Sequence, residues 1–370
     1  MVVKALQSDE EFHRYVSFAQ EVYDQNPYWT PPNAEHLVSL LNGTSPIAAT
    51  SKVQPFWVEN NGKILATLTA VIEDTYNLRW NERMGHLLFF EALPGSQDAV
   101  SELFSSAFQW LKAHNCDAVR SALLISWQVP LTIDAYDCVP TFLHTYNPPY
   151  YHSYLKNAGF MTERGAVQYQ VEFTSDLAER YQQMVEHALH SGVSLRSMDF
   201  DRLEEETIRL TDICNDTFSE HWGMQPTTAA AMQGLTFGLK DFLVPEFIVF
   251  AEAEAETIGV VYSLPDLNQA FHKMRGKELE NNFAEFLQLL QQIDHGALII
   301  IGVKKQYRGR GVNLALAAKS YLAMIERGYK TGSYTIVLDD NRRSRRTAER
   351  LGAKVTRNFV IYRHELAVRN

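Results

Sequence analysis

The stretch that decides the fold is Gln306-Tyr307-Arg308-Gly309-Arg310-Gly311, a Q-x-x-G-x-G sequence between an apolar segment and a helical one. Residues 297–303 are almost all apolar, which is typical of a buried strand. From residue 312 the apolar side chains recur at helical spacing as far as Gly328. A strand that enters a helix through a glycine loop points several backbone N–H groups at one place, and this favours binding of a pyrophosphate.

The charges around this loop agree with an anion site. Cations stand at Lys304, Lys305, Arg308 and Arg310. The last 70 residues carry 16 Lys and Arg against 5 Asp and Glu, whereas the whole chain has a net charge of −10. The first 300 residues therefore carry a net −21. The alternative is a basic surface turn with a glycine helix cap, which the string alone does not exclude.

The same order of elements occurs twice along the chain, which predicts an α/β protein with two similar units. In the second half a strand at 333–338, Asn341, a helix, Gly352 and a strand at 355–363 follow the loop. In the first half, apolar positions at helical spacing follow a strand at 84–93, and a strand at 166–173 closes the half. The expected domains are 1–173 and 197–370, with a packed helical connector at 174–196.

The loop in this setting resembles the GCN5-related N-acetyltransferase (GNAT) superfamily, whose phosphate loop is [Q/R]-x-x-G-x-[G/A]. The resemblance is specific over about 296–363 and extends by element order from about 193. It implies two GNAT-like units, each a mixed, mostly antiparallel twisted sheet flanked by helices. It also implies a diverged first copy, as in the tandem arrangement of mycothiol synthase and the Fem transferases.

The first copy is expected to be degenerate. Where the second copy has its glycine loop, the first has Leu93-Pro94-Gly95-Ser96-Gln97-Asp98. Pro94 lacks an N–H group and Asp98 adds a negative charge where phosphates would bind. We therefore expect the working cofactor site in the second half only.

The resemblance implies a site for acetyl-CoA, or another acyl-CoA, in a V between the two central strands. Gly302 would permit the bulge that separates the strands, and the Val303 N–H would polarise the thioester carbonyl. A strand end without a site is the alternative for Gly302. The expected cofactor-binding residues are Gly302, Val303, Gln306, Tyr307, Arg308, Gly309, Arg310, Gly311, Val312 and Asn341.

The catalytic acid and base are less well marked. The family commonly has a tyrosine acid four residues before the glycine that follows the last helix, and here that position is Ala348. Water, the released amine or another tyrosine such as Tyr262 could protonate the thiolate instead. Candidates for the acceptor end form two groups, for each of which a solvated loop is the favoured alternative. They are the catalytic candidates His221 and Asp266 and the substrate-binding candidates Trp222 and Asn268.

Other features exclude some classes of function. Cys116, Cys138 and Cys214 are far apart and lack ligand spacing, so we expect buried thiols and no metal. The start has no signal sequence and no stretch would span a membrane, which favours a cytoplasmic protein. The negative charge argues against DNA and membrane partners. The arginines at 342–346 could clamp the CoA 3′-phosphate, contact RNA, which is not favoured, or form an exposed helix face.

The best interpretation is an acyl-CoA-dependent N-acyltransferase, with acetyl transfer to the amine of a small molecule or peptide by direct attack on the thioester. The charge of the first 300 residues favours a cationic acceptor. One alternative is an aminoacyl-tRNA-dependent transferase of the Fem kind. Another is a non-catalytic protein that binds CoA as a sensor or scaffold. Neither the acceptor, the acyl length nor the oligomeric state follows from the sequence.

Overall fold

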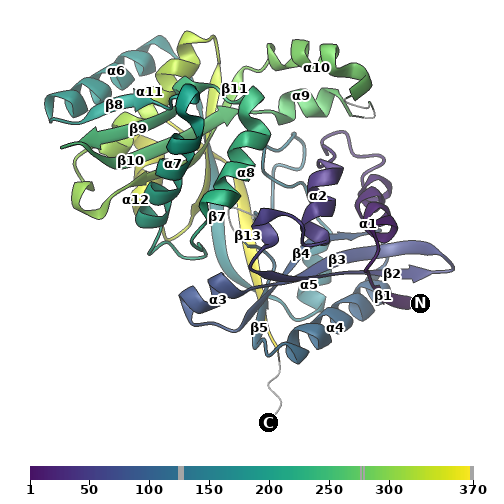
Figure 1. Cartoon of the computed structure of the whole chain (residues 1–370). Helices are drawn as coiled ribbons and strands as arrows, with labels where there is room; N and C mark the ends of the chain where they lie inside the picture. The colour runs from purple at the N-terminus through teal and green to yellow at the C-terminus, as the bar shows by residue number, and fades with distance from the viewer. Residues whose placement is uncertain (124–128, 276, 278–279, 367–370) are drawn as a thin grey trace. The chain divides into compact units, whose positions relative to one another are not determined.

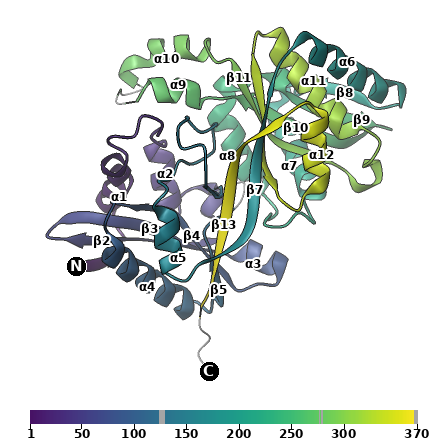
Figure 2. The ribbon, with the colours of Figure 1, turned by 180° about the vertical axis from the view of Figure 1, so that it is seen from behind.

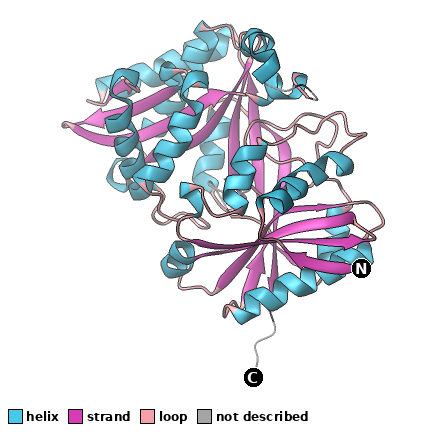
Figure 3. Ribbon diagram, turned by 45° about the vertical axis from the view of Figure 1, so that its right-hand side comes forward, coloured by secondary structure: helices cyan, strands magenta, loops and turns pink. Residues whose placement is uncertain are grey.

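The computed structural model describes residues 1–123, 129–275, 277 and 280–366, and the chain divides into two compact units (Figure 1). Unit 1 comprises Met1–Gly165 and Phe359–Asn370, and unit 2 comprises Ala166–Asn358. Each unit contains a mixed, mostly antiparallel set of sheet strands with helices on its faces, as the sequence predicts (Figure 3).

Unit 1 has the strand order β1-β2-β3-β4-β5-β13, with β6 also on β13. Helix α4 carries an apolar stripe that includes Val100, Leu103 and Phe104, and it buries that stripe against β2 and β3. The elements are β1 (Val2–Ala5), α1 (Asp9–Val22), α2 (Ala34–Leu41), β2 (Ser51–Asn60), β3 (Lys63–Glu73), α3 (Asp74–Trp80), β4 (Met84–Ala92), α4 (Gln97–Ala113), β5 (Ala118–Arg120), β6 (Leu131–Thr132) and α5 (Tyr151–Asn157).

Unit 2 has the strand order β7-β12-β11-β10-β9-β8. Its elements are α6 (Ser175–His190), β8 (Ser194–Ser197), α7 (Leu203–Thr217), α8 (Ala229–Leu239), β9 (Ile248–Ala253), β10 (Glu256–Pro265), α9 (Asn268–Lys273), α10 (Phe283–Leu290), β11 (His295–Val303), α11 (Val312–Glu326), β12 (Thr331–Leu338) and α12 (Arg342–Arg350). Helices α7 and α8 cover one face of this sheet, and α6, α11 and α12 cover the other (Figures 1 and 2).

The segment expected to connect the halves is part of the core of unit 2. Helix α6 packs along α11, and its Tyr181 is fully buried. The Tyr181 hydroxyl donates a 2.6 Å hydrogen bond to the carbonyl of Leu351, just after α12. Because α6 covers α11 from outside, α11 is buried on most of its surface rather than along one stripe.

Two strands change unit along their length. β7 (Met161–Glu172) begins in unit 1, but from Ala166 onward it pairs with β12 in unit 2. β13 (Lys354–Glu365) begins in unit 2, and from Phe359 it pairs with β6 and then β5 of unit 1. The order of elements along the sequence does not reveal this exchange, because β7 follows α5 of unit 1 but pairs in unit 2, and β13 follows α12 of unit 2 but pairs in unit 1.

Local sequence signals explain several element boundaries. The turn Asn60-Asn61-Gly62 joins β2 to β3, and Asn61 and Gly62 have φ of 51° and 78°, the conformation that such hairpins require. Ser8 and Glu11 form a capping box at the start of α1. These contacts lie within a few residues of each other, so the sequence alone predicts them.

Cys116 and Cys214 are buried, but Cys138 is exposed, so the expectation of three buried thiols is wrong for Cys138. It lies in a loop without regular structure, where the apolar surroundings of a core are missing. Within the described ranges, no helix has both the length and the hydropathy needed to cross a membrane. The same ranges contain no group of three or more His, Cys, Asp or Glu side chains that could hold a metal ion.

Because the part of β13 from Phe359 onward lies in unit 1, we expect Val360→Asp to destabilise unit 1 selectively. Val360 is 5% exposed and packs in the core of unit 1, so a carboxylate there should lower the free energy of unfolding of that unit by about 3 kcal/mol. Hydrogen exchange should accelerate in β3 and β4. The control is Val355→Asp, on the same strand but 40% exposed. Equal loss of protection in β10 and β11 would contradict the assignment.

Candidate functional site

The two central strands of unit 2 part from each other halfway along their length. β11 and β12 run parallel and form four residue pairs, the last of which is Leu298 with Tyr334. Beyond it, β11 continues to Val303 and β12 to Leu338, with no further pair between them in the described part of the chain. The sheet therefore has a V-shaped opening between the last residues of β11 and β12.

Both strands are irregular where they part. Ile299 is an extra residue of β11 relative to the ladder with β10, and so forms a bulge. On β12, the register with β7 shifts between Tyr334 and Val337, and Ile336 has a positive φ of 43°. Bulges bend a strand and end local pairing, so the two irregularities account for the separation of the strands.

The bulge is not at Gly302, so that expectation is wrong. Gly302 is a regular partner of Val260. A Cβ atom on Gly302 would lie 2.3 Å from the hydroxyl oxygen of Thr217, at the end of α7. Glycine is therefore needed there because α7 approaches the strand closely. The sequence could not reveal this, since Thr217 lies 85 positions earlier.

The backbone of Val303 faces the opening. The Lys304 N–H donates to the carbonyl of Ile258, which fixes the hydrogen-bonding phase of the β10–β11 ladder. In an antiparallel ladder, alternate residues direct their N–H and C=O groups away from the partner strand. Ile301 and Val303 are such residues, so their N–H groups point from β11 toward the opening. The Val303 N–H, which the resemblance implies as a donor, is thus directed toward the opening.

The glycine loop presents unsatisfied backbone donors. Gly309 and Gly311 have φ of 82° and 80°, and Gly311 is the N-cap of α11 without a side-chain cap. The first hydrogen bond of α11 runs from Ala315 N–H to Gly311 C=O, so the N–H groups of 312–314 donate to no protein group in the described ranges. A Cβ on Gly309 would meet nothing within 4 Å. The space before these donors is open, which suits an anion.

The cations of the loop are less available than their number suggests. Arg308 turns inward: its Nε donates to Val303 C=O at 2.9 Å and its Nη2 to Thr217 C=O at 3.0 Å, which ties the loop to the end of α7. Lys304 pairs with Glu256 at 2.5 Å, and Lys305 with Glu220 at 3.1 Å.

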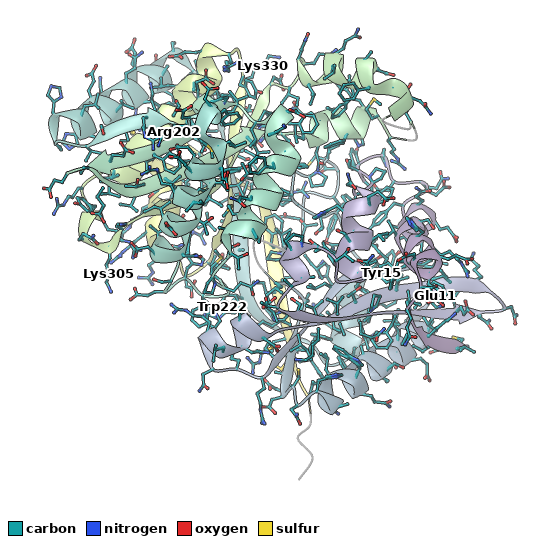
Figure 4. All side chains as sticks on the ribbon, in the orientation of Figure 1. Glu11, Tyr15, Arg202, Trp222, Lys305 and Lys330 are labelled. Carbon is teal, nitrogen blue, oxygen red and sulfur yellow. The ribbon has the colours of Figure 1, made fainter. Side chains whose placement is uncertain are left out.

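Arg310 is exposed, and its guanidinium lies 5.3 Å from the ring centre of the half-buried Tyr307. Gln306 is also exposed, and Lys305 lies at the outer edge of unit 2 (Figure 4). An anion could thus reach the backbone donors of the loop and the exposed side chains of Gln306 and Arg310.

The structure brings two of the predicted site residues into contact. The side chains of His221 and Asn341 meet, with 3.3 Å between Nε2 and Nδ2. The Asn341 Oδ1 accepts the Ser344 N–H and caps α12, while His221 Nδ1 lies 3.1 Å from the carbonyl of Trp222. The segment after α7 therefore lies beside the start of α12, which follows the strand β12 of the opening.

Asp266 and Asn268 lie near the start of β11, at the end opposite to Val303 and the glycine loop. Both are buried just after β10, where the Asp266 N–H donates to the carbonyl of His295, the first residue of β11. Val303, at the other end of β11, is about 25 Å away at ~3.3 Å per residue. The structure thus does not bring Asp266 and Asn268 together with the loop.

Tyr262 lies on β10 opposite Ile300 of β11 and is only 3% exposed. Burial raises the pKa of its hydroxyl, and that hydroxyl has no hydrogen-bond partner among the described residues. Ala348 is completely buried, so the position at which the resemblance implies a tyrosine is filled by a methyl group in the core. Sequence reasoning did not single out Thr217 or Tyr334, which shape the opening from elements far from the loop.

Comparison with known proteins agrees with this geometry. Residues 208–353 match the model of the acetyltransferase (GNAT) family, a range that includes α7, both strands of the opening, the loop and α12. Residues 208–353 therefore form a GNAT domain. The chain resembles the bacterial ceramide synthase of Caulobacter vibrioides, with 27% identity over 96% of this chain and 95% of that protein. It also resembles Protein YghO of Escherichia coli K12, with 21% identity over 99% and 95% of the two chains.

Solved structures share the fold over the full length. A tandem GNAT protein from the clavulanic acid biosynthesis pathway aligns with a TM-score of 0.59 and 11% identity, covering 100% of this chain and 99% of that one. A GCN5-related N-acetyltransferase from Sphaerobacter thermophilus aligns with a TM-score of 0.54 and 14% identity, covering 99% and 96%. The family match places residues 208–353 among the acetyltransferases of the GNAT family.

Unit 1 has tyrosine hydroxyls at the strand end where unit 2 is open. Its β4 corresponds to β11, but the Ala92 N–H at the end of β4 donates to the Tyr151 hydroxyl at 2.8 Å. Tyr150 donates to the Ala92 carbonyl at 2.7 Å. Tyr154 donates to the Leu93 carbonyl at 2.9 Å and accepts the Ser96 N–H at 3.1 Å. In unit 1, backbone groups at the end of β4 and in the turn before α4 are therefore satisfied by α5 and the residue before it.

The same end of β4 holds an unusual carboxyl group. Glu91 is half-buried, lies opposite Thr67 in the sheet and accepts a 2.6 Å hydrogen bond from Tyr151. Burial raises the pKa of Glu91 to about 7, although the tyrosine hydroxyl partly opposes the shift. Glu91 therefore belongs to the tyrosine cluster that closes the degenerate copy.

We expect the stability of the Glu91→Gln variant, compared with that of the wild type, to increase as the pH rises. With a pKa of about 7 in the native state and a lower one when unfolded, native Glu91 holds its proton longer, so the wild type loses stability between about pH 4.5 and 7. Glutamine still accepts from Tyr151 but does not titrate. Urea unfolding at pH 5 and pH 8 should show a relative gain of about 1–3 kcal/mol. Glu102→Gln, on the exposed face of α4, should show no such change.

Proposed function

We propose that the chain transfers an acyl group from acyl-CoA to an amine, with the acyl-CoA bound by unit 2. The observation that carries this proposal is the opening between β11 and β12, with the Val303 N–H on one side and the donors of the glycine loop beyond its end. A long, flexible thioester with a pyrophosphate fits these features in order. In unit 1, the N–H groups of Ala92, at the end of the strand, and of Ser96, in the turn, donate to tyrosine hydroxyls.

Each part of the site has a separate task. The N–H groups of residues 309–314 would hold the pyrophosphate, with charge from Arg310. The Val303 N–H would donate to the thioester oxygen, and this donor is worth more once charge develops on that oxygen as the amine attacks. Arg308 positions the loop through its bonds to Val303 and Thr217 and leaves the donors free for the ligand.

The acceptor is proposed to enter past His221 and Trp222. His221 is half-buried, and its Nε2 faces Asn341 beside the start of α12. An imidazole in this place could take the proton of the attacking ammonium group, directly or through water. Asp266 and Asn268 are not part of this proposal because of their position at the far end of β11.

We propose a long-chain amine as the acceptor class. The support is the relative named bacterial ceramide synthase, since a ceramide is the N-acyl product of a long-chain amino alcohol. Helix α8 adds a physical argument: its sequence AAAMQGLTFGL is almost entirely apolar, yet only Met232 and Thr236 are buried. Phe237 is 43% exposed. An apolar surface next to the segment that bears His221 would suit an alkyl chain.

The loop is tested by Gly311→Asp. A side chain at φ of 80° is strained, and a carboxylate there would repel a pyrophosphate, so binding of CoA should be lost. Wild type should gain about 2.7 kcal/mol of stability at 100 times its Kd for CoA, visible as a thermal shift. The variant should lose the shift while its own melting temperature changes only modestly.

Arg343→Ala, an exposed change in α12, is the matched control and should keep most of the shift. If Gly311→Asp keeps the full shift, or wild type has none, the loop is an ordinary helix cap and the proposed function is wrong.

The acceptor class is tested by release of free CoA thiol. Wild type is given acetyl-CoA or palmitoyl-CoA together with sphinganine, spermidine or a short peptide amine. We expect sphinganine to give the largest kcat/KM, and Phe237→Ser to raise the KM for sphinganine more than that for spermidine. A preference for the short amines would contradict the acceptor proposal, and CoA binding without any turnover would favour a non-catalytic CoA sensor.

A further inference from the structure

Helix α12 carries four exposed arginines whose guanidinium groups have no carboxylate partner among the described residues. They are Arg342, Arg343, Arg346 and Arg350. The fifth arginine of the helix, Arg345, pairs with Asp339 at 3.1 Å. Other cations of unit 2 also have carboxylate partners, among them Arg196, Lys304, Lys305, Arg327 and Lys330. The exposed face of α12 therefore differs from the rest of the unit in its uncompensated positive charge.

Three of these arginines form one row along the helix. Arg342, Arg346 and Arg350 are spaced by four residues, so they lie one above the other over about 12 Å at ~1.5 Å per residue. Thr347 and Ala348 are the buried residues of the helix and lie on its other side. The row, which we call the arginine row, therefore faces solvent.

The arginine row is unfavourable for the helix by itself. Like charges four residues apart repel each other, and cations in the first turn oppose the positive end of the helix dipole. The first turn of α12 contains Arg342 and Arg343 but no acid. Of the acids just before the helix, Asp339 is paired with Arg345. An anionic partner on this face would offset both effects, so the charge favours a docking surface.

The arginine row belongs to the helix that adjoins the phosphate donors of the glycine loop. Asn313, the second residue of α11, donates through Nδ2 to the Oγ1 atom of Thr347 in α12 at 2.6 Å. The backbone N–H of Asn313 is one of the open donors at residues 312–314. A large group attached to a phosphate at these donors would therefore have α12 as a neighbouring surface.

We propose that the arginine row docks a small acidic carrier protein, whose phosphopantetheine arm delivers the acyl group to the opening. This inference rests on the proposed function and names the source of the thioester. CoA and carrier proteins present the same phosphopantetheine arm, but in a carrier its phosphate is esterified to a serine of the protein. The amine nitrogen forms the N–C bond, the C–S bond breaks, and the proton that the amine loses is balanced by the one that the carrier thiol gains.

The size and surroundings of the arginine row favour a protein partner over an extended polyanion. RNA presents phosphates along its whole length, and an anionic membrane presents a wide charged surface. The row covers one side of a nine-residue helix, and the exposed Glu349 lies on the same helix. The first 300 residues carry a net −21 and would repel a polyanion that extends beyond the row. One acidic helix of a small protein has the length to match it.

The test combines two acyl donors with a charge reversal. Wild type and the double variant Arg342→Glu, Arg346→Glu are assayed with palmitoyl-CoA and with a bacterial acyl carrier protein that bears palmitoyl-phosphopantetheine. The acceptor is the amine that wild type uses best. With the loaded carrier, we expect kcat/KM of the variant to be at least about 10-fold lower, and that of wild type to fall between about 50 and 300 mM salt. With palmitoyl-CoA, the two proteins should differ less than about threefold, since that donor has no protein surface to dock.

A second double variant separates docking from net charge. Lys63→Glu, Lys112→Glu changes the charge of the chain equally at exposed positions of unit 1, and it should leave the rates with both donors unchanged. The α12 variant should melt at or above the temperature of wild type, because one change puts an acid in the first turn and the other puts one four residues before Arg350. Changing an exposed acid of the carrier to lysine should restore the rate of the α12 variant when that acid faces the row.

Each other result decides against the carrier or against the proposed function. If wild type uses palmitoyl-CoA but not the loaded carrier, or if the α12 variant loses the same factor with both donors, the carrier surface is wrong and the proposed function stands. Binding of tRNA or of phosphatidylglycerol vesicles that the α12 variant loses, with unchanged carrier kinetics, would assign the row to that polyanion and overturn the proposal. If wild type releases no thiol from either donor with any amine, the proposed function itself is wrong.

Discussion

The parting of β11 from β12 is the constraint on which the rest of unit 2 depends. Where a parallel ladder ends although both strands continue, their facing N–H and C=O groups are left unpaired. This costs free energy unless other groups form hydrogen bonds with them. Here the bulge at Ile299 and the irregularity at Ile336 hold the strands apart. Under the proposed function, the N–H groups of β11 that are directed toward this opening would donate to a polar ligand.

The first unit shows the other solution to the same problem. There, too, the central strands part after a short ladder, His86 with Arg120 being the last pair. Tyr150, Tyr151 and Tyr154 close the space by bonding to the strand end and the following turn. A hydroxyl that satisfies a backbone group permanently stabilises the fold, but it excludes a ligand. Under the proposed function, unit 2 would bind its ligand at a strand end whose counterpart in unit 1 is closed by tyrosines.

Charge had a smaller part in the site than the sequence suggested. The loop carries four cations, but Lys304 and Lys305 are paired with carboxylates and Arg308 with carbonyl groups. What the structure leaves open is the backbone itself. Backbone donors at a helix start are fixed in place, so they need no ordering of long side chains when an anion binds.

The sequence by itself determined the features that are local: the glycine loop between a strand and a helix, the hairpin at Asn61-Gly62, the helical stripes and the loss of the loop in the first half. In each, the interacting groups lie within a few residues. The tertiary structure alone decided where the strand from Phe359 onward pairs, that Gly302 serves the approach of Thr217, and that Asp266 lies at the far end of β11. It also decided that Tyr334 of β12 meets Ser344 of α12. Pairing across long separations depends on which strand edges and helix faces remain available once the cores have formed, and no single stretch of sequence encodes that.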